Sequence, residues 1–316
     1  MLEIKNISKS YGKHIALSNL CLNIPEGALF GLVGPNGAGK TTFIKIFSGI
    51  IKPDRGEIIF GDMDVLRKEK EAKELIGYVP DVLGIYDNMT VFEYMSFFAA
   101  TYGLTGYVAR KKTEILLEQV GLTDKIDYFL NELSRGMQQK LCVARALIHD
   151  PKLIIMDEPA SGLDPRSRYE FKELLQELNG SGKTVILSSH ILSEVSEICT
   201  DIGIIETGKV VISGSVDNIL EKVESSNPIK IKVINNVDIA LDILKNNANV
   251  KLLSVDSGNF VVYFEGKKAD EANLLKTLID KDVMVTEFIR EAGSLESFFI
   301  KVTNHSNESV IFSNEY

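Results

Sequence analysis

Short apolar runs recur along the first two thirds of the chain. The segments 28–33, 153–156 and 184–187 are dominated by aliphatic side chains. Such runs, without alternating polar residues, are typical of strands buried on both faces of a parallel sheet. Apolar residues at helical spacing follow the first run over 43–50, and Pro53 lies just past that pattern. The pattern therefore predicts an α/β domain.

The pattern changes within this region. Residues 1 to about 30 indicate strands, with turns at 11–13 and 25–27. Between about 85 and 150, apolar residues recur at helical spacing instead, with one helix around 92–102 and a second around 115–120. The α/β domain, expected over residues 1–223, is thus interrupted by a helical insert.

A second unit is predicted over residues 228–303. Its element order, βαββαβ, is that of a small α+β domain of ferredoxin-like type. It carries no obvious catalytic cluster, so a regulatory or dimer-supporting role is favoured. The polar tail 304–316 is expected to be mobile. The expected elements are a strand at 229–233, a helix at 239–244, a hairpin of 252–255 with 260–264, a helix at 274–278 and a strand at 283–288.

Composition and net charge argue against some classes of function. The 316 residues carry a net charge of -9 and the pI is about 5.2, which argues against a broad nucleic-acid surface. No segment approaches the ~18 uncharged apolar residues of a membrane span, and residues 1–5 do not form a signal peptide. Any work at a membrane would need a partner. Cys21, Cys142 and Cys199 share no metal or redox spacing and are expected to be buried, reduced thiols of a cytosolic protein.

The first candidate functional segment is Gly34–Thr41, which fits the pattern G-x-x-x-x-G-K-[ST]. It lies between the expected strand at 28–33 and the expected helix at 43–50. Glycines on such a turn let backbone N–H groups point at an anion, and the helix N-terminus adds positive potential. Lys40 is expected to reach the β- and γ-phosphates, and Thr41 to ligate Mg²⁺. The segment predicts a nucleotide site.

Two carboxylates follow the apolar run 153–156, at the end of the strand where ligands of open α/β sheets bind. Because neighbouring residues of a strand point to opposite faces, Asp157 and Glu158 can differ in role. Asp157 is expected to hold Mg²⁺, directly or through water, and Glu158 to orient or deprotonate the attacking water. The alternative is an acidic turn without a catalytic role.

Three further features remain open on the residues alone. His190 follows the strand around 184–189, where a histidine either senses a γ-phosphate or is structural. Ser134 is expected to cap a helix whose first turn contains Gly136; this is either an anion site or an ordinary capped helix. Tyr11 lies in a turn, where an aromatic ring either stacks on a base or packs against protein.

Together these segments resemble the ATP-binding cassette family over about residues 1–220. The resemblance implies that two cassettes pair head to tail, and that ATP is held between the Walker A loop of one chain and the signature helix of the other. The matches are Tyr11 to the adenine-stacking aromatic, Gly34–Thr42 to Walker A, 133–138 to the signature motif, 153–158 to Walker B, 161–164 to the D-loop and His190 to the switch histidine.

The resemblance also implies a set of site residues, with ATP and Mg²⁺ as cofactors. The implied nucleotide-binding residues are Tyr11, Gly34, Asn36, Gly37, Gly39, Lys40, Thr41, Thr42, Ser134 and Gly136. The implied catalytic residues are Lys40, Glu158 and His190, and the implied metal ligands are Thr41, Asp81 and Asp157.

Within the family, the chain looks like the ATPase subunits of bacterial ABC-2-type exporters, through residues 133–141 and 294–303. This implies a cytoplasmic subunit, peripheral on the inner face of the cell membrane, whose partners are an integral-membrane permease and a second cassette, identical or different. The loop 82–88 is expected to meet the permease. Its candidate contacts are Leu83, Ile85 and Tyr86.

The chain departs from the family pattern at a few positions. Asp81 replaces the usual glutamine, or the glutamate of this subfamily; its side chain is one methylene shorter than that of glutamate, and its charge adds a negative group near the phosphates. Arg135 and Met137 stand where many relatives carry glycine and glutamine, a difference shared within the subfamily. Ala160 replaces a commoner threonine.

Two alternatives belong to other function classes. Soluble relatives that act on ribosomes usually carry two cassettes, and DNA-repair relatives insert a long coiled coil, for which residues 42–153 leave no room. A nucleotide sensor that does not hydrolyse is disfavoured by the presence of Glu158 and His190. No nucleic-acid partner is therefore expected. The residues do not identify the transported substrate, because the permease would select it.

Overall fold

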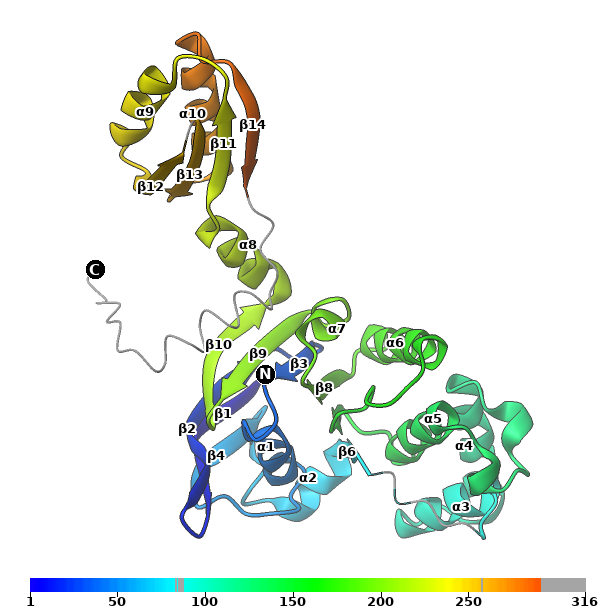
Figure 1. Cartoon of the computed structure of the whole chain (residues 1–316). Coiled ribbons are helices and arrows are strands. Elements are labelled where there is room, and N and C mark those ends of the chain that lie inside the picture. Colours follow the sequence, from blue (N-terminus) through cyan, green and yellow to red (C-terminus); the bar gives the residue numbers. More distant parts are fainter. Residues whose placement is uncertain (83, 85–87, 257, 291–316) are drawn as a thin grey trace. The chain divides into compact units, whose positions relative to one another are not determined.

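The computed structural model describes residues 1–82, 84, 88–256 and 258–290 (Figure 1). The chain divides into two compact units between Val216 and Asp217. Several sequence predictions lie outside the described residues. They are the permease contacts Leu83, Ile85 and Tyr86, the subfamily segment 294–303 and the tail 304–316.

The first unit is built around a six-stranded sheet of order β10-β9-β3-β8-β7-β6. Three of its strands are buried along their whole length and confirm the apolar runs: β3 (Leu29–Val33), β7 (Leu153–Met156) and β8 (Thr184–Ser189). Both β3 and β7 pair with β8 in parallel. The sheet is completed by β6 (Ile76–Val79), β9 (Asp201–Glu206) and β10 (Lys209–Ser215).

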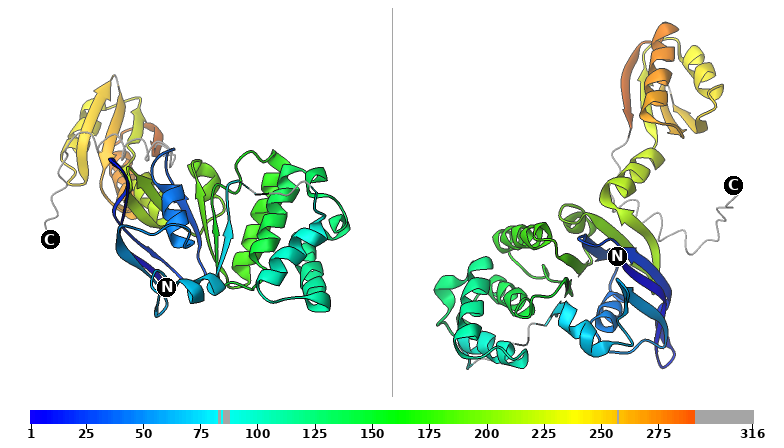
Figure 2. Two further views of the ribbon diagram at one scale, coloured as in Figure 1. Left: turned by 90° about the horizontal axis from the view of Figure 1, so that it is seen from below. Right: turned by 180° about the vertical axis from the view of Figure 1, so that it is seen from behind.

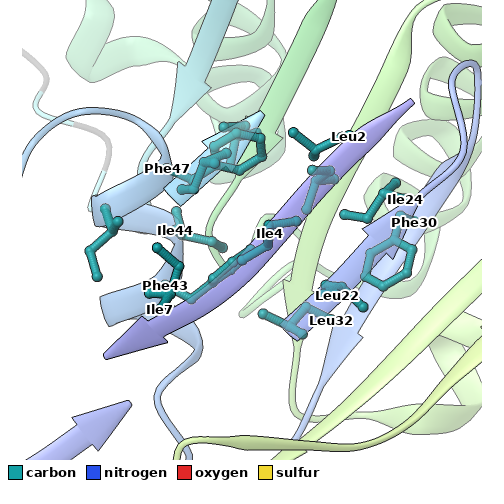
Figure 3. Packing of buried hydrophobic residues seen from close by; sticks show 14 of the residues in the cluster. Leu2, Ile4, Ile7, Leu22, Ile24, Phe30, Leu32, Phe43, Ile44 and Phe47 are labelled. Carbon is teal, nitrogen blue, oxygen red and sulfur yellow. The ribbon is translucent and has the colours of Figure 1, made fainter. Parts of the chain in front are cut away.

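A smaller antiparallel sheet of order β2-β1-β4-β5 packs against helix α1 (Lys40–Phe47). In Figure 3, Phe43, Ile44 and Phe47 of α1 lie close to Ile4 and Ile7 of the neighbouring strand. Each such side chain contributes roughly 1.5–3 kcal/mol on burial, so this core fixes the start of α1. The strands are β1 (Leu2–Tyr11), β2 (His14–Ile24), β4 (Arg55–Phe60) and β5 (Met63–Asp64).

Three helices lie in the region of the expected helical insert. Helices α3 (Val91–Thr101), α4 (Gly106–Gln119) and α5 (Arg135–Ala146) gather at one end of the first unit, away from α1 (Figures 1 and 2). Thr90 caps α3 by accepting from the Glu93 N–H at 3.2 Å. The other helical elements are α2 (Glu69–Leu75), α6 (Pro165–Gly180), α7 (Leu192–Ser196) and 3₁₀ turns at Thr123–Lys125 and Leu130–Glu132.

The second unit begins with α8 (Val216–Ser226). Its sheet has the order β12-β13-β11-β14 with antiparallel pairing. One face packs against the apolar sides of both helices, through residues such as Ala240, Leu244, Leu274 and Leu278. The elements are β11 (Ile229–Val233), α9 (Val237–Lys245), β12 (Val250–Asp256), β13 (Asn259–Phe264), α10 (Lys268–Asp280) and β14 (Val285–Arg290).

One prediction about the cysteines is wrong. Cys142 and Cys199 are buried, but Cys21 is exposed. It lies on β2, an outer strand of the smaller sheet, and burial alternates along that strand so that Leu20 and Leu22 point inward. The apolar neighbours of Cys21 therefore occupy the opposite face. Among the described residues, no helix is long and apolar enough to cross a membrane.

Candidate functional site

The ends of three neighbouring strands form a pocket of about 410 Å³. Because β3, β7 and β8 run in parallel, the segments that follow them meet at one edge of the sheet. The pocket therefore combines the phosphate loop with Glu158 and His190. The lining residues are Tyr11, His14, Ala16, Asn36, Gly37, Gly39, Lys40, Thr41, Thr42, Asp81, Glu158, Ser161 and His190.

The phosphate loop has a conformation that only glycine adopts easily. Gly37 and Gly39 have φ angles of 83° and 108°. A Cβ on Gly39 would lie 2.6 Å from the Ala16 carbonyl oxygen, whereas one on Gly37 would meet nothing within 4 Å. No side chain caps α1 after Gly39, and no acidic residue lies in its first turn. The first N–H groups of α1 thus suit an anionic ligand.

Lys40 holds a buried positive charge beside this loop. Its side chain is 6% exposed, and Nζ donates to the carbonyls of Gly34 at 2.7 Å and Pro35 at 3.2 Å. The same Nζ lies 3.4 Å from Glu158 Oε1. The ammonium group is therefore fixed between the loop and the carboxylate.

Asp157 lies under the loop and is 2% exposed. Its Oδ1 accepts hydrogen bonds from Thr41 Oγ1 at 3.2 Å and Ser188 Oγ at 2.8 Å. Burial raises the pKa of the Asp157 carboxyl, and the negative charges of Asp81 and Glu158 add to this effect. A cation placed here would offset both causes.

The oxygen atoms at this point fit Mg²⁺. Thr41 offers a hydroxyl and Asp157 a carboxylate, and Asp81 is exposed at the same pocket. The part of the chain that the structure describes holds no group of three or more His, Cys, Asp or Glu side chains that could form a closed metal site. Mg²⁺ at phosphate sites commonly uses one or two carboxylates, with waters and phosphate oxygens completing its shell. The donor set therefore suits a metal that is shared with a nucleotide.

Glu158 is held in a strained backbone conformation. Its φ is 47°, in the left-handed region, and its N–H donates to Ser188 Oγ at 2.9 Å. One carboxylate oxygen faces Lys40, and the other, Oε2, lies 2.9 Å from His190 Nδ1. The carboxylate is thus oriented from both sides and lines the pocket.

Some residues that line or support the pocket were not identified from the sequence. Ser188 bonds both the Glu158 N–H and the Asp157 carboxylate. A hydroxyl residue in a fully buried strand beside the acid-bearing strand is the signal that points to it. His14 and Ala16 also line the pocket, and the Ala16 carbonyl lies beside Gly39 of the loop. Tyr11 is paired with His14 in the hairpin of β1 and β2 and is 50% exposed, so its ring is available at the pocket edge.

Ser134 and Gly136 do not line this pocket. Ser134 Oγ caps α5 by accepting from the Met137 N–H at 3.3 Å. Gly136 is buried, and a Cβ there would lie 2.6 Å from Ser167 Oγ of α6. The start of α5 is therefore separate from the phosphate loop of its own chain.

Comparison with known proteins agrees with this geometry. Residues 17–161 match the family described as ABC transporter. The linearmycin resistance ATP-binding protein LnrL of Bacillus subtilis (strain 168) is 36% identical over 81% of this chain and 82% of its own length. The Nod factor export ATP-binding protein I of Cupriavidus metallidurans is 34% identical over 70% of this chain and 73% of its own.

A solved structure is similar over about two thirds of the chain. The dimeric post-hydrolysis ATP-binding cassette MJ0796, bound to ADP and Pi, gives a TM-score of 0.62 at 28% identity and covers 68% of this chain and 99% of its own. The fold, the pocket and the relatives agree. The chain belongs to the ABC transporter family, in which it is an ATP-binding and ATP-hydrolysing subunit of the exporter type.

Proposed function

We propose that the chain is the motor subunit of an ABC-2-type exporter and that it hydrolyses Mg-ATP between two cassettes paired head to tail. One observation carries the proposal. Lys40, Glu158 and His190 converge on one pocket, while Ser134 and Gly136 lie at the start of a helix outside it. A single chain therefore offers two separate halves of a site, and a second cassette would unite them.

The roles follow from the contacts. The phosphate loop and Lys40 would bind the phosphates, and Tyr11 would stack on the adenine. Thr41, Asp157 and Asp81 would hold Mg²⁺, which when bound there neutralises phosphate charge. Glu158 would orient or deprotonate the attacking water, with His190 fixing its carboxylate at 2.9 Å.

The capped start of α5 is suited to binding the phosphates of a nucleotide held by a second chain. Helix N-termini bind anions through free N–H groups and the helix dipole. Ser134 is exposed there, and no acidic residue lies in the first turn of α5. The helix would therefore contact the phosphates held by the partner cassette.

The membrane partner and the location belong to the same proposal. A permease would receive the closing motion, and the subunit would lie at the cytoplasmic face of the membrane, where ATP is available. The relatives named for linearmycin resistance and Nod factor export support an exporter. Co-purification with a multi-span membrane protein would test this part.

The two domains are assigned different roles. We assign residues 1–223 to the cassette and 228–303 to a ferredoxin-like domain, because its order of elements and the sheet order β12-β13-β11-β14 fit that type. Since none of the described residues of this domain lines the pocket, its proposed role is regulatory or dimer-supporting.

The direct test is Glu158→Gln. Hydrolysis should fall by about 10²-fold or more, the scale for a lost general base, while ATP binding persists. With turnover blocked, Mg-ATP should convert the 35.0 kDa monomer to a dimer in size-exclusion chromatography with light scattering. Glu177→Gln, on the exposed side of α6, is the matched control and should behave like the wild type. A monomer at saturating ATP would refute the head-to-tail arrangement.

A further inference from the structure

The last turn of α5 and the residues just after it contact β6, the strand that leads to Asp81. Arg145 Nη2 donates to the Tyr78 carbonyl at 3.3 Å, and His149 Nε2 lies 3.1 Å from the Ile76 carbonyl. Between them, Gly77 leaves no room, since a Cβ there would lie 2.5 Å from the Ala146 carbonyl oxygen. The helix end and the strand are therefore in direct contact.

The same two side chains also hold α3. Arg145 Nη1 donates to Tyr94 Oη at 2.9 Å, and its guanidinium carbon lies 5.0 Å from the Phe98 ring centroid. The His149 ring stacks on Tyr102 at 4.2 Å with an interplanar angle of 6°. A planar guanidinium with several fixed donors suits such a junction better than a flexible ammonium. Arg145 thus joins α3, α5 and β6.

The two ends of α5 lie at different parts of the proposed site. The helix has 12 residues, about 18 Å at 1.5 Å per residue. Its start carries Ser134 and Gly136, and its end is fixed to β6, which stops at Val79, shortly before Asp81. Because most of the helix between the two ends is buried, it transmits a displacement along its axis without much bending.

We propose that Arg145 is a positioning residue that sets the start of α5 relative to the Asp81 segment, so that Ser134 and Gly136 are correctly presented to the nucleotide of a second cassette. The proposal rests on the proposed function. Arg145 does not line the nucleotide pocket. Its loss should therefore weaken closure of the dimer and leave binding of ATP to one chain unchanged.

The experiment uses the full chain with Glu158→Gln as the background. Mg-ATP is titrated against Arg145→Met, Arg145→Lys and the control Arg110→Met, whose side chain pairs with Glu114 on its own helix at 3.0 Å. Dimer formation is followed by light scattering, and monomer affinity by a fluorescent ATP analogue at low protein concentration. Arg145→Met should raise the ATP concentration for half-maximal dimer by about 10-fold, since two hydrogen bonds of a charged group are lost. Arg145→Lys should restore only part of the loss, and Arg110→Met should change nothing.

Tyr94→Phe removes only the hydroxyl that accepts the hydrogen bond from Arg145. This variant tests the same contact if Arg145→Met does not fold. It should shift dimer formation in the same direction by a smaller factor. Unchanged dimer formation in folded Arg145→Met, or an equal loss of monomer affinity, would overturn the role of Arg145. A Glu158→Gln background that forms no dimer at all would instead refute the proposed function.

Discussion

The two units of the chain bury different kinds of side chain. The first buries a lysine and an aspartate, Lys40 and Asp157, at 6% and 2% exposure, and holds Glu158 at a φ of 47°. In the described part of the second unit, Asn227 is the only buried polar side chain, and the rest of its core is apolar. Buried charge and backbone strain cost stability. Positive φ angles at non-glycine residues also occur in the second unit, at Asn236 and Asp282. Buried charge is therefore the distinguishing feature: among the described residues, the buried charged side chains are Lys40 and Asp157, and both lie at the phosphate loop.

The comparison predicts that substitutions at the pocket of the first unit mainly lower ATPase activity. Substitutions in the core of the second unit should mainly lower its stability. Replacing Lys40 by alanine should give the largest effect. Turnover should fall by about 10²–10³-fold, the scale for losing a group that stabilises transition-state charge, because the fixed ammonium beside the loop is gone. Steady-state ATPase measurement checks this. Lys183→Ala, whose ammonium bonds to Asp150 at 2.7 Å, should retain activity. A wild-type rate in Lys40→Ala would remove Lys40 from the active site.

Phe260→Ala should affect only the second unit. Phe260 is 1% exposed in its apolar core, and such truncations cost about 3–5 kcal/mol. Denaturant unfolding should show an early transition of the second unit, while ATPase activity stays near that of the wild type, because Phe260 does not line the nucleotide pocket. Val255→Ala, at a partly exposed position of β12, should change little. A parallel loss of ATPase would show that the units depend on each other.

Substitution of Asp81 should change activity by a few-fold. Asp81→Gln should keep or raise the ATPase rate, because it restores reach and removes a charge that faces phosphate. Asp81→Ala should lower the rate and shift the Mg²⁺ optimum upward, because a metal contact is lost. Mg²⁺-titrated ATPase of the three proteins measures both effects. Superimposable titration curves would separate Asp81 from the metal.

The smallest expected effect is a pH dependence of stability. Burial lowers the pKa of His149 below its ordinary 6.5. The unfolded chain then binds more protons than the folded one, so this group makes the protein less stable as pH falls from about 6.5 towards the lowered folded value. His149→Gln should therefore lose less Tm than the wild type between pH 7 and pH 5. Equal slopes of Tm against pH would contradict this role of His149.

Much of the pocket follows from the sequence because its residues directly succeed strands. Gly34–Thr41, Asp157 and Glu158 come after apolar runs, and parallel pairing then brings them together. Contacts between distant segments are less predictable. Ser188 is a buried hydroxyl with no motif around it, and the bond from Arg145 to Tyr94 joins residues 51 positions apart.

The fold shows the same limit. The fully buried strands β3, β7 and β8 appear in the sequence as continuous apolar runs. Helix α2 is short and buries only Ala72, so its pattern is too weak to predict a helix. Cys21 shows that apolar neighbours do not ensure burial when a strand has one open face. Local sequence patterns therefore predict helices and strands well. They predict which side chains of a strand are buried only where protein packs against both faces of the strand.

The central claim is that each active site combines residues of two chains, and mixing two inactive variants tests it most directly. Lys40→Ala damages the phosphate loop, and Ser134→Arg damages the start of α5, with monomer ATP affinity expected to stay near normal in the latter. Each alone should be inactive. In an equal mixture, half of the pairs combine both variants and contain one intact site, so about a quarter of the wild-type sites should be restored. ATPase activity of the mixture approaching that fraction is the predicted result; a mixture as inactive as its components would contradict the shared site.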